Sequence, residues 1–206
     1  MGELYDFFVN SYSTYSTLDI VLEFLAFWFG IISVIYAKKQ NILVYPTGII
    51  CTIITMYLMY KVSLLGHILV NLVYTLISIF GWWNWSRKKN NDLIVRVSRF
   101  SFADLPKSLL IFFFIIAVAY IAHDYFATDF EGQIKELDIF TSGIFVTAMW
   151  LMANKKLENW ILWIIGNIIT IPLYLSSDKI ILSIQYVIFT ILAIQAYIQW
   201  KKSLSK

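Results

Sequence analysis

The sequence contains little charge and few of the residues that build disulfide-linked or soluble proteins. Of its 206 residues, 14% are charged and 60% are hydrophobic, with a mean hydropathy of +0.72. A soluble domain carries roughly 25% charged residues, so this chain cannot cover a globular surface with polar side chains. Its single cysteine, Cys51, excludes an internal disulfide and lies in an apolar run. The composition therefore predicts an all-α integral membrane protein, for which the bilayer is the solvent.

Catalytic motifs are missing as well. The chain contains no HExxH, no GxSxG, no GxxxxGK(S/T) phosphate loop and no cysteine pair. Acidic residues are nearly absent from the apolar runs, where Glu23 is the one candidate and lies close to the expected interface. Ion-coupled carriers usually keep ionisable groups at membrane depth. These absences argue against an enzyme, predict neither a metal nor a cofactor, and favour passive, substrate-selective permeation.

Seven apolar stretches predict seven transmembrane helices in a single domain, residues 1–206. Four stretches are long enough to span a bilayer by themselves: Leu43–Tyr60, Val62–Ser86, Asn159–Ser177 and Ile180–Trp200. Three are shorter: Phe24–Ala37, Ser108–Ala122 and Ile139–Asn154. The first of these reaches spanning length if it begins near Ile20, and the other two reach it by including flanking residues.

The basic residues predict the orientation of these helices. With seven spans, one side of the membrane receives 13 of the 16 basic residues. They are Lys38, Lys39, Arg87, Lys88, Lys89, Arg96, Arg99, Lys107, Lys155, Lys156, Lys201, Lys202 and Lys206, whereas Lys61, Lys135 and Lys179 fall on the other side. Because cytoplasmic loops are enriched in Lys and Arg, the C-terminus is expected in the cytoplasm and the N-terminus outside. The clustered charge thus reports topology, and no nucleic-acid partner is expected.

An internal repeat relates the second and third spans to the sixth and seventh. A shift of 115 residues places Thr55 on Thr170, Thr75 on Thr190 and Trp85 on Trp200. The two copies run in the same direction, since an even number of spans separates them. The predicted plan is three-plus-one-plus-three: a first unit over 19–86, a linker helix over 104–124 and a second unit over 138–200. Parallel repeats of this kind recur in transporters that bind substrate between the two units.

Polar side chains form stripes within three of the predicted spans. The sixth span places five polar or aromatic residues on one helical face: Trp160, Trp163, Asn167, Thr170 and Tyr174. Asn71 and Tyr74 share a face of the third span, and the seventh span contributes Gln185. Indoles stack on flat or cationic rings, and amides orient a sugar or a carboxamide. The stripes therefore predict a site for an aromatic, hydrogen-bonding solute.

Simpler interpretations of these stripes stay open. Trp160 follows Lys155, Lys156 and Glu158, so it also fits an aromatic belt at the membrane interface. Asn71 and Asn167 also fit interhelical hydrogen bonding. In that case the chain would be a membrane scaffold or partner-binding subunit that carries no small molecule.

Three segments resemble the PnuC family of bacterial vitamin transporters. The stretch 156–163, continuing to Asn167, resembles the family's ENWxxW signature, and 81–87 (GWWNWSR) resembles its GWYxWSR. Residues 37–41 (AKKQN), ahead of 45–50 (YPTGII), fit the family's first cytoplasmic loop. The resemblance extends from about Leu22 to Trp200.

This resemblance implies a fold, a mechanism and a cargo. PnuC-like proteins have a three-plus-one-plus-three fold related to SWEET sugar transporters and work by facilitated diffusion in the bacterial inner membrane. Phosphorylation in the cytoplasm drives net uptake. The type substrate is nicotinamide riboside, relatives carry thiamine or riboflavin, and members form homotrimers. By position, Trp160 and Trp163 would flank the ligand and Asn167 would hydrogen-bond it. Asn71 stands where many relatives have glutamine, which leaves open whether the vitamin is nicotinamide riboside or thiamine.

Overall fold

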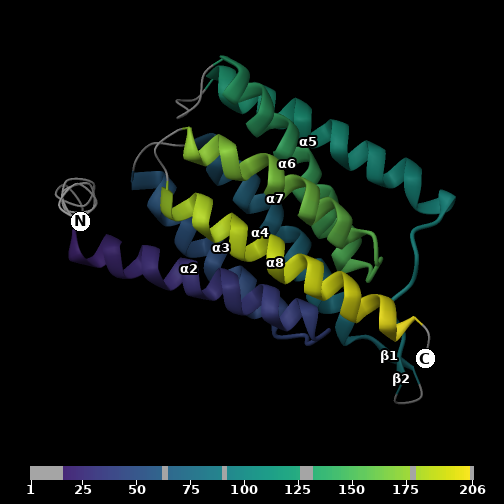
Figure 1. Ribbon diagram of the computed structural model, residues 1–206. Coiled ribbons are helices and arrows are strands. Elements are labelled where there is room, and N and C mark those ends of the chain that lie inside the picture. Colours follow the sequence, from purple (N-terminus) through teal and green to yellow (C-terminus); the bar gives the residue numbers. More distant parts are fainter. Residues whose placement is uncertain (1–15, 62–64, 90–91, 126–131, 177–179, 205–206) are drawn as a thin grey trace.

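A computed structural model describes residues 16–61, 65–89, 92–125, 132–176 and 180–204 (Figure 1). Within these ranges the chain forms seven α-helices, so the predicted all-α fold is confirmed. They are α2 (Thr17–Lys38), α3 (Val44–Lys61), α4 (Leu65–Ser86), α5 (Leu105–Tyr125), α6 (Gly132–Ala153), α7 (Asn159–Leu175) and α8 (Ile180–Ser203). Between α4 and α5 lie a short antiparallel hairpin, β1 (Lys88–Lys89) and β2 (Asp92–Leu93), and a 3₁₀ turn, η1 (Phe102–Asp104).

The three spans predicted as short are longer in the structure, because polar residues begin or continue these helices. Ser16 caps α2, and its Oγ accepts a hydrogen bond from the Asp19 backbone N–H at 3.2 Å. Helix α6 begins at Gly132, seven residues before the predicted Ile139. Asp138 therefore lies within the helix, and the prediction that Glu23 is the one acidic candidate inside a span was wrong. The predicted limits Val62 and Ser177, and Lys179 and Lys206, lie outside the described residues.

Most helices present apolar side chains outward. Five described helices, α2, α4, α5, α6 and α8, are long and apolar enough to cross a membrane, and α7 is a shorter apolar helix. In four of the five, between 11% and 28% of the most apolar window is buried within the protein, whereas 67% of that window is buried in α6. Side chains such as Leu110 and Phe113 point outward. Helix α6 is therefore the centre of a bundle whose apolar outer surface suits lipid.

The helices pack in two consecutive sets of three. Helix α3 lies between α2 and α4, and α7 lies between α6 and α8 (Figure 1). The sets meet at two places, where α4 packs on α6 and α8 packs on α2. Helix α5 lies against α6 on the outside of the bundle. The third helix of each set thus contacts the first helix of the other.

Two indole hydrogen bonds hold these meeting places together. Trp85, at the end of α4, donates from Nε1 to the Ala153 carbonyl at 3.1 Å, and Trp200, near the end of α8, donates to the Ala37 carbonyl at 3.0 Å. The two indoles also contact each other, with ring centroids 6.0 Å apart. The shift of 115 residues that relates the predicted repeats pairs Trp85 with Trp200. It pairs Ala37 with Met152, the residue just before Ala153. The same type of bond therefore closes both contacts between the sets.

Helices α2 and α6 also end in the same way. Gln40 and Lys155, again 115 residues apart, both have positive φ, at 54° and 51°. In each case the following residue donates its backbone N–H to the carbonyl five residues earlier. Asn41 donates to Tyr36 and Lys156 donates to Leu151, both at 2.9 Å. This is the Schellman pattern that satisfies the last carbonyls of a helix. Lys155 is buried with its Nζ 4.4 Å from the centre of the Trp85 ring, and burial lowers its pKa.

The connection from α4 to α5 is tied to the connection from α6 to α7. The Ser98 N–H donates to the Lys155 carbonyl at 3.0 Å, and the Leu157 N–H donates to the Ser98 carbonyl at 2.9 Å. Two residues after Ser98, the Phe100 N–H donates to Glu158 Oε2 at 2.6 Å. Lys156 Nζ lies 2.9 Å from Asp104 Oδ2. These contacts fix the start of α5 against the second set of helices.

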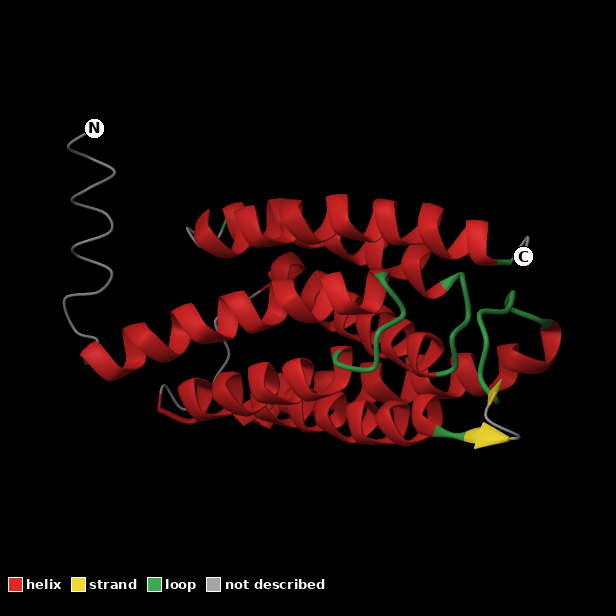
Figure 2. Ribbon diagram, turned by 90° about the horizontal axis from the view of Figure 1, so that it is seen from below, coloured by secondary structure: helices red, strands yellow, loops and turns green. Residues whose placement is uncertain are grey.

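The described loops, the hairpin and the C-terminal end of α8 gather at one end of the bundle (Figure 2). This end, called here the C-terminal end, carries Lys38, Arg87, Lys156 and Lys202 among other basic residues. Lys61 and Lys135 lie at the opposite end, where each forms an ion pair with an aspartate. The two ends of the bundle therefore differ in charge.

Removing one indole N–H at a meeting place should destabilise the fold. We expect Trp200→Phe to lower stability by about 1–2 kcal/mol, since it removes a buried hydrogen bond and part of a packed ring. Trp82→Phe is the matched control, because the Trp82 side chain is exposed at the bundle surface. Thermal unfolding in detergent would measure both, and equal midpoints for the two variants would contradict the assignment.

Candidate functional site

The middle of α7 places an indole and an amide on its inner face. Trp163 stacks on Phe145 of α6, with ring centroids 5.4 Å apart and an interplanar angle of 27°. Asn167, one turn further along α7, is 1% exposed. Helical spacing explains the shared direction, because residues four apart lie on one face. The predicted pairing of an indole with a neighbouring amide is therefore present inside the bundle.

The ring stack continues from Phe145 through α8 and back to α7. Phe145 stacks on Tyr186 at 5.9 Å and 27°, and Tyr186 stacks on Tyr174 at 5.3 Å and 29°. The phenol groups of Tyr174 and Tyr186 also share a hydrogen bond. Tyr74 of α4 packs, as Trp163 does, against the hydrophobic core beside these rings. These five residues, the aromatic cluster, come from four helices that belong to both sets.

Two polar atoms beside this cluster are buried without a partner. Among the residues that the structure describes, neither Trp163 Nε1 nor Asn167 Oδ1 has a hydrogen-bond partner. Leaving a buried polar group unpaired costs about 1–3 kcal/mol. A donor and an acceptor held in this way are suited to a ligand that supplies the missing partners. The geometry offers ring stacking, one N–H donor and one amide acceptor.

Gly166 makes the stack possible. A Cβ on Gly166 would overlap the Phe145 ring, so a larger residue there would displace the ring from its place. By contrast, a Cβ on Gly48 of α3 would meet only Ser33 Oγ, at an ordinary 3.6 Å. Gly166 therefore serves close packing of α6 against α7.

The remaining predicted site residues lie in different surroundings. Trp160 is 2% exposed in the core and packs edge-to-face on Trp200 at 5.4 Å, and its Nε1 also has no partner among the described residues. Thr170 is buried and donates its hydroxyl to the Gly166 carbonyl at 2.8 Å. Trp163 and Tyr74 pack against the edge of the same core. The sixth-span stripe thus runs from the core into the aromatic cluster.

Two further predicted residues lie on helices of the other interfaces. Gln185 of α8 approaches α2, with its Nε2 3.5 Å from where a Cβ on Gly30 would be. Asn71 lies on α4 one turn before Tyr74, and its backbone carbonyl accepts a hydrogen bond from Thr75. Thr75 also bonds Thr52 of α3 at 2.8 Å. Gln185 thus marks the α2–α8 contact, and Asn71 begins the stripe that leads to Tyr74.

Sequence reasoning missed two members of the cluster, Phe145 and Tyr186. Tyr186 lies 115 residues after Asn71, so the repeat itself carried a signal for it. Phe145 carried no such signal, because the same shift pairs it with Gly30 and it stands among apolar neighbours. Only the packing of α6 against α7 brings its ring to Trp163.

Adding one methyl group at Gly166 tests whether the stack is tightly packed. We expect Gly166→Ala to destabilise the protein by about 1–3 kcal/mol, the usual cost of overpacking. Gly48→Ala should have little effect or stabilise slightly, since alanine favours a helix interior. Thermal unfolding of both variants in detergent gives the comparison. The double variant Gly166→Ala/Phe145→Leu should recover part of the loss, and no recovery would contradict the role assigned to Phe145.

Known proteins similar to this chain are transporters. The chain is 23% identical to the nicotinamide riboside transporter PnuC of Escherichia coli over 201 residues, covering 84% of this chain and 82% of that protein. It is 24% identical to the nicotinamide riboside transporter PnuC of Neisseria mucosa over 185 residues, covering 84% and 69%.

The fold and the family agree with these similarities. The crystal structure of the vitamin B3 transporter PnuC matches with a TM-score of 0.71 at 22% identity, covering 98% of this chain and 89% of that one. The family model described as nicotinamide mononucleotide transporter matches residues 20–202. The predicted family is thereby confirmed: this chain belongs to the nicotinamide mononucleotide transporter family, which includes the PnuC proteins that its motifs resemble.

Proposed function

We propose that this protein takes up nicotinamide riboside across the bacterial cytoplasmic membrane by facilitated diffusion. The observation that carries the proposal is the unpartnered pair, Trp163 Nε1 and Asn167 Oδ1, held beside stacked rings within the bundle. Nicotinamide riboside has a flat cationic ring for the indole, and its carboxamide and ribose supply donors and acceptors for the two polar atoms. Membership of a transporter family supports the same conclusion.

The charge of the site favours a riboside over a mononucleotide. A phosphate group is usually bound by arginine, lysine or helix N-termini. The described members of the aromatic cluster and Asn167 include no basic residue, and the basic residues lie at the ends of the helices. A phosphorylated substrate would therefore lose its hydration without a compensating cation. The uncharged ribose hydroxyls of a nucleoside suit these neutral surroundings better.

We infer that the transporter has the three-plus-one-plus-three plan, with seven transmembrane helices. Its support comes from positions 115 residues apart that make the same contacts: the indole donors Trp85 and Trp200, and the helix ends at Gln40 and Lys155. A further pair is edge-to-face, with Tyr45 on Trp85 and Trp160 on Trp200. Two similar units that meet at two similar contacts can rock about them. We infer that this rocking exposes the site alternately to each side.

The residues of the proposed site differ in how directly they would contact the substrate. Trp163, Asn167, Tyr74 and Asn71 would contact the nucleoside directly, between the two units. Trp160, Thr170 and Gln185 belong to the same predicted site. By family resemblance the protein would assemble as a homotrimer, and phosphorylation in the cytoplasm would retain the cargo. The mass of the detergent-solubilised complex would test the assembly.

Truncating Trp163 should weaken the binding of nicotinamide riboside. We expect Trp163→Ala to cost about 1–3 kcal/mol, or roughly 5–150-fold in Kd, if the indole stacks on a desolvated cationic ring. Trp163→Phe should lose less, since it keeps an aromatic face. Calorimetric titration of the purified protein with nicotinamide riboside, thiamine and riboflavin in parallel would measure affinity and cargo together.

Trp82→Ala is the matched control for this titration, because it removes an indole from the outer surface of α4. Equal affinity of wild-type and Trp163→Ala protein would refute the stacking role. Tighter binding of thiamine than of nicotinamide riboside would change the cargo and leave the transporter class intact. Absence of binding to all three would favour a scaffold role.

The proposed orientation places the C-terminal end of the bundle in the cytoplasm, on the positive-inside rule. In a Cys51→Ser background, we expect Tyr125→Cys to react with a membrane-impermeant maleimide in intact spheroplasts. Lys202→Cys should react only after the membrane is permeabilised. Both positions are exposed at opposite ends of the bundle, which makes each the control for the other. The reverse pattern of labelling would overturn the orientation.

A further inference from the structure

A groove with two lysines lies on α8, near the C-terminal end of the bundle. It has a volume of about 370 Å³ and is lined by Tyr197, Ile198, Lys201 and Lys202. These residues lie on one side of the helix, because positions three and four apart are neighbours on a helical surface. Ile198 is exposed, and so are both lysines. The groove therefore places apolar surface directly beside two amino groups.

An exposed apolar stripe leads along α8 to this groove. Its residues follow one another at positions i, i+3, i+7, i+10 and i+14, which places them on one helical face. Each is between 43% and 54% exposed: Ile184, Val187, Ile191, Ile194 and Ile198. The stripe lies within the part of α8 that is long and apolar enough to cross a membrane. The lysines therefore stand where a lipid-facing surface ends.

The groove also lies beside one of the two contacts between the sets of helices. The ends of α2 and α8 are joined there by side-chain hydrogen bonds. Lys38 Nζ donates to Gln195 Oε1 at 2.9 Å. Gln40 Nε2 donates to Ser203 Oγ at 3.1 Å. The indole bond of Trp200 belongs to the same contact, so a ligand in the groove would bind next to it.

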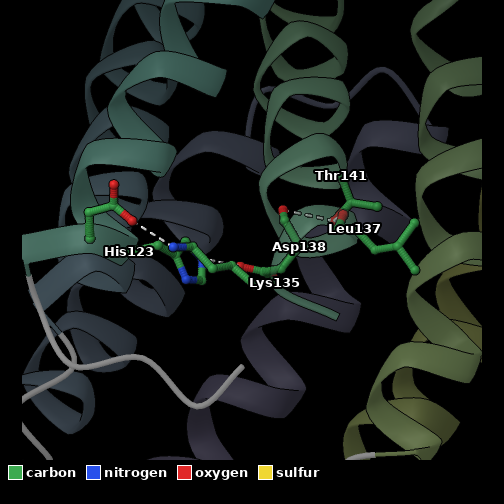
Figure 3. Close-up of polar contacts among 6 residues, drawn as sticks. His123, Lys135, Leu137, Asp138 and Thr141 are labelled. Atoms are coloured by element: carbon green, nitrogen blue, oxygen red, sulfur yellow. Dashed lines mark hydrogen bonds and ion pairs between the residues drawn. The ribbon is translucent and has the colours of Figure 1, made fainter. Parts of the chain in front are cut away.

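The positive charge at the groove differs from the charge at the opposite end of the bundle. At that end Lys135 Nζ lies 2.6 Å from Asp124 Oδ1 (Figure 3). Lys61 is paired with an aspartate as well. Within the ranges that the structure describes, no carboxylate pairs with Lys201 or Lys202. Two neighbouring cations without an acidic partner attract an anion.

We propose that this groove, called here the α8 groove, binds the headgroup of an anionic phospholipid. Lys201 and Lys202 pair with its phosphate, and the stripe that ends at Ile198 contacts an acyl chain. Tyrosine suits the headgroup level, because its ring is apolar and its hydroxyl forms hydrogen bonds. A soluble anion would engage the lysines and leave the stripe uncovered, whereas a lipid covers both. Basic side chains at the end of a span are the usual partners of anionic lipids on the cytoplasmic side.

Thermal unfolding of the full-length protein in an uncharged detergent tests this proposal. The midpoint is followed as phosphatidylglycerol is added, with phosphatidylcholine, which has no net charge, as the reference lipid. A ligand that binds only the folded protein raises the midpoint as its concentration rises. We expect phosphatidylglycerol to raise the wild-type midpoint more than phosphatidylcholine does. Lys201→Gln/Lys202→Gln should need on the order of tenfold more phosphatidylglycerol for the same shift, since each lysine contributes to attraction of the anionic lipid.

Two control variants separate this groove from general attraction between charges. Lys201→Arg/Lys202→Arg keeps both charges and should keep the wild-type response. Lys88→Gln/Lys107→Gln removes the same charge from exposed positions outside α2 and α8, and should keep it as well. An unchanged lipid response in Lys201→Gln/Lys202→Gln, or an equal loss in both glutamine variants, would overturn the inference.

Two further outcomes would assign the α8 groove to a different occupant and also overturn the inference. Inorganic phosphate that raises the wild-type midpoint as much as phosphatidylglycerol would indicate a site for a soluble anion. A smaller mass of the detergent-solubilised complex in Lys201→Gln/Lys202→Gln, with an unchanged lipid response, would indicate a second copy of the chain. The proposed function is tested separately, by titration with nicotinamide riboside, and stands or falls independently of the lipid.

Discussion

The hydrogen bonds from Trp85 and Trp200 to helix-end carbonyls are the constraint on which the rest of the structure depends. A bilayer offers apolar helices no hydrophobic reason to associate, so packing and hydrogen bonds must hold them together. Each indole fills space in the core and also satisfies a carbonyl of the other set of helices. These two bonds fix how α4 meets α6 and how α8 meets α2. The position of α6 then brings Phe145 to Trp163.

The segment 156–167 combines packing contacts with two residues of the proposed site. Glu158 accepts the Phe100 N–H and ties the linker before α5 to the second set of helices. Trp160 packs on Trp200 in the core. Trp163 and Asn167, further along α7, keep polar atoms without partners beside the ring stack. These residues differ in their surroundings because α7 begins at the C-terminal end of the bundle and runs towards its middle. Trp160 therefore lies in the core near that end, and Trp163 and Asn167 lie deeper in the bundle.

In the proposed function, the aromatic cluster would let a chain with few charges recognise a cationic solute. Rings attract a cation without the large desolvation cost of burying a free carboxylate. Helix α6, the most buried of the five candidate spans, contributes Phe145 to the ring stack, so its position determines the geometry of the proposed site.

Much of this protein follows from its sequence, and the remainder follows from packing. Long apolar runs require helices, because a bilayer cannot satisfy exposed backbone groups, and the stripe with Trp163 and Asn167 follows from helical spacing alone. The extent of α6 did not follow, since its polar first turns are stabilised by contacts with α5, such as Asp138 with His123. Phe145 could not be assigned to the aromatic cluster from the sequence. Its place there arises from neighbours on α7 and α8, and only tertiary structure decides which helices meet.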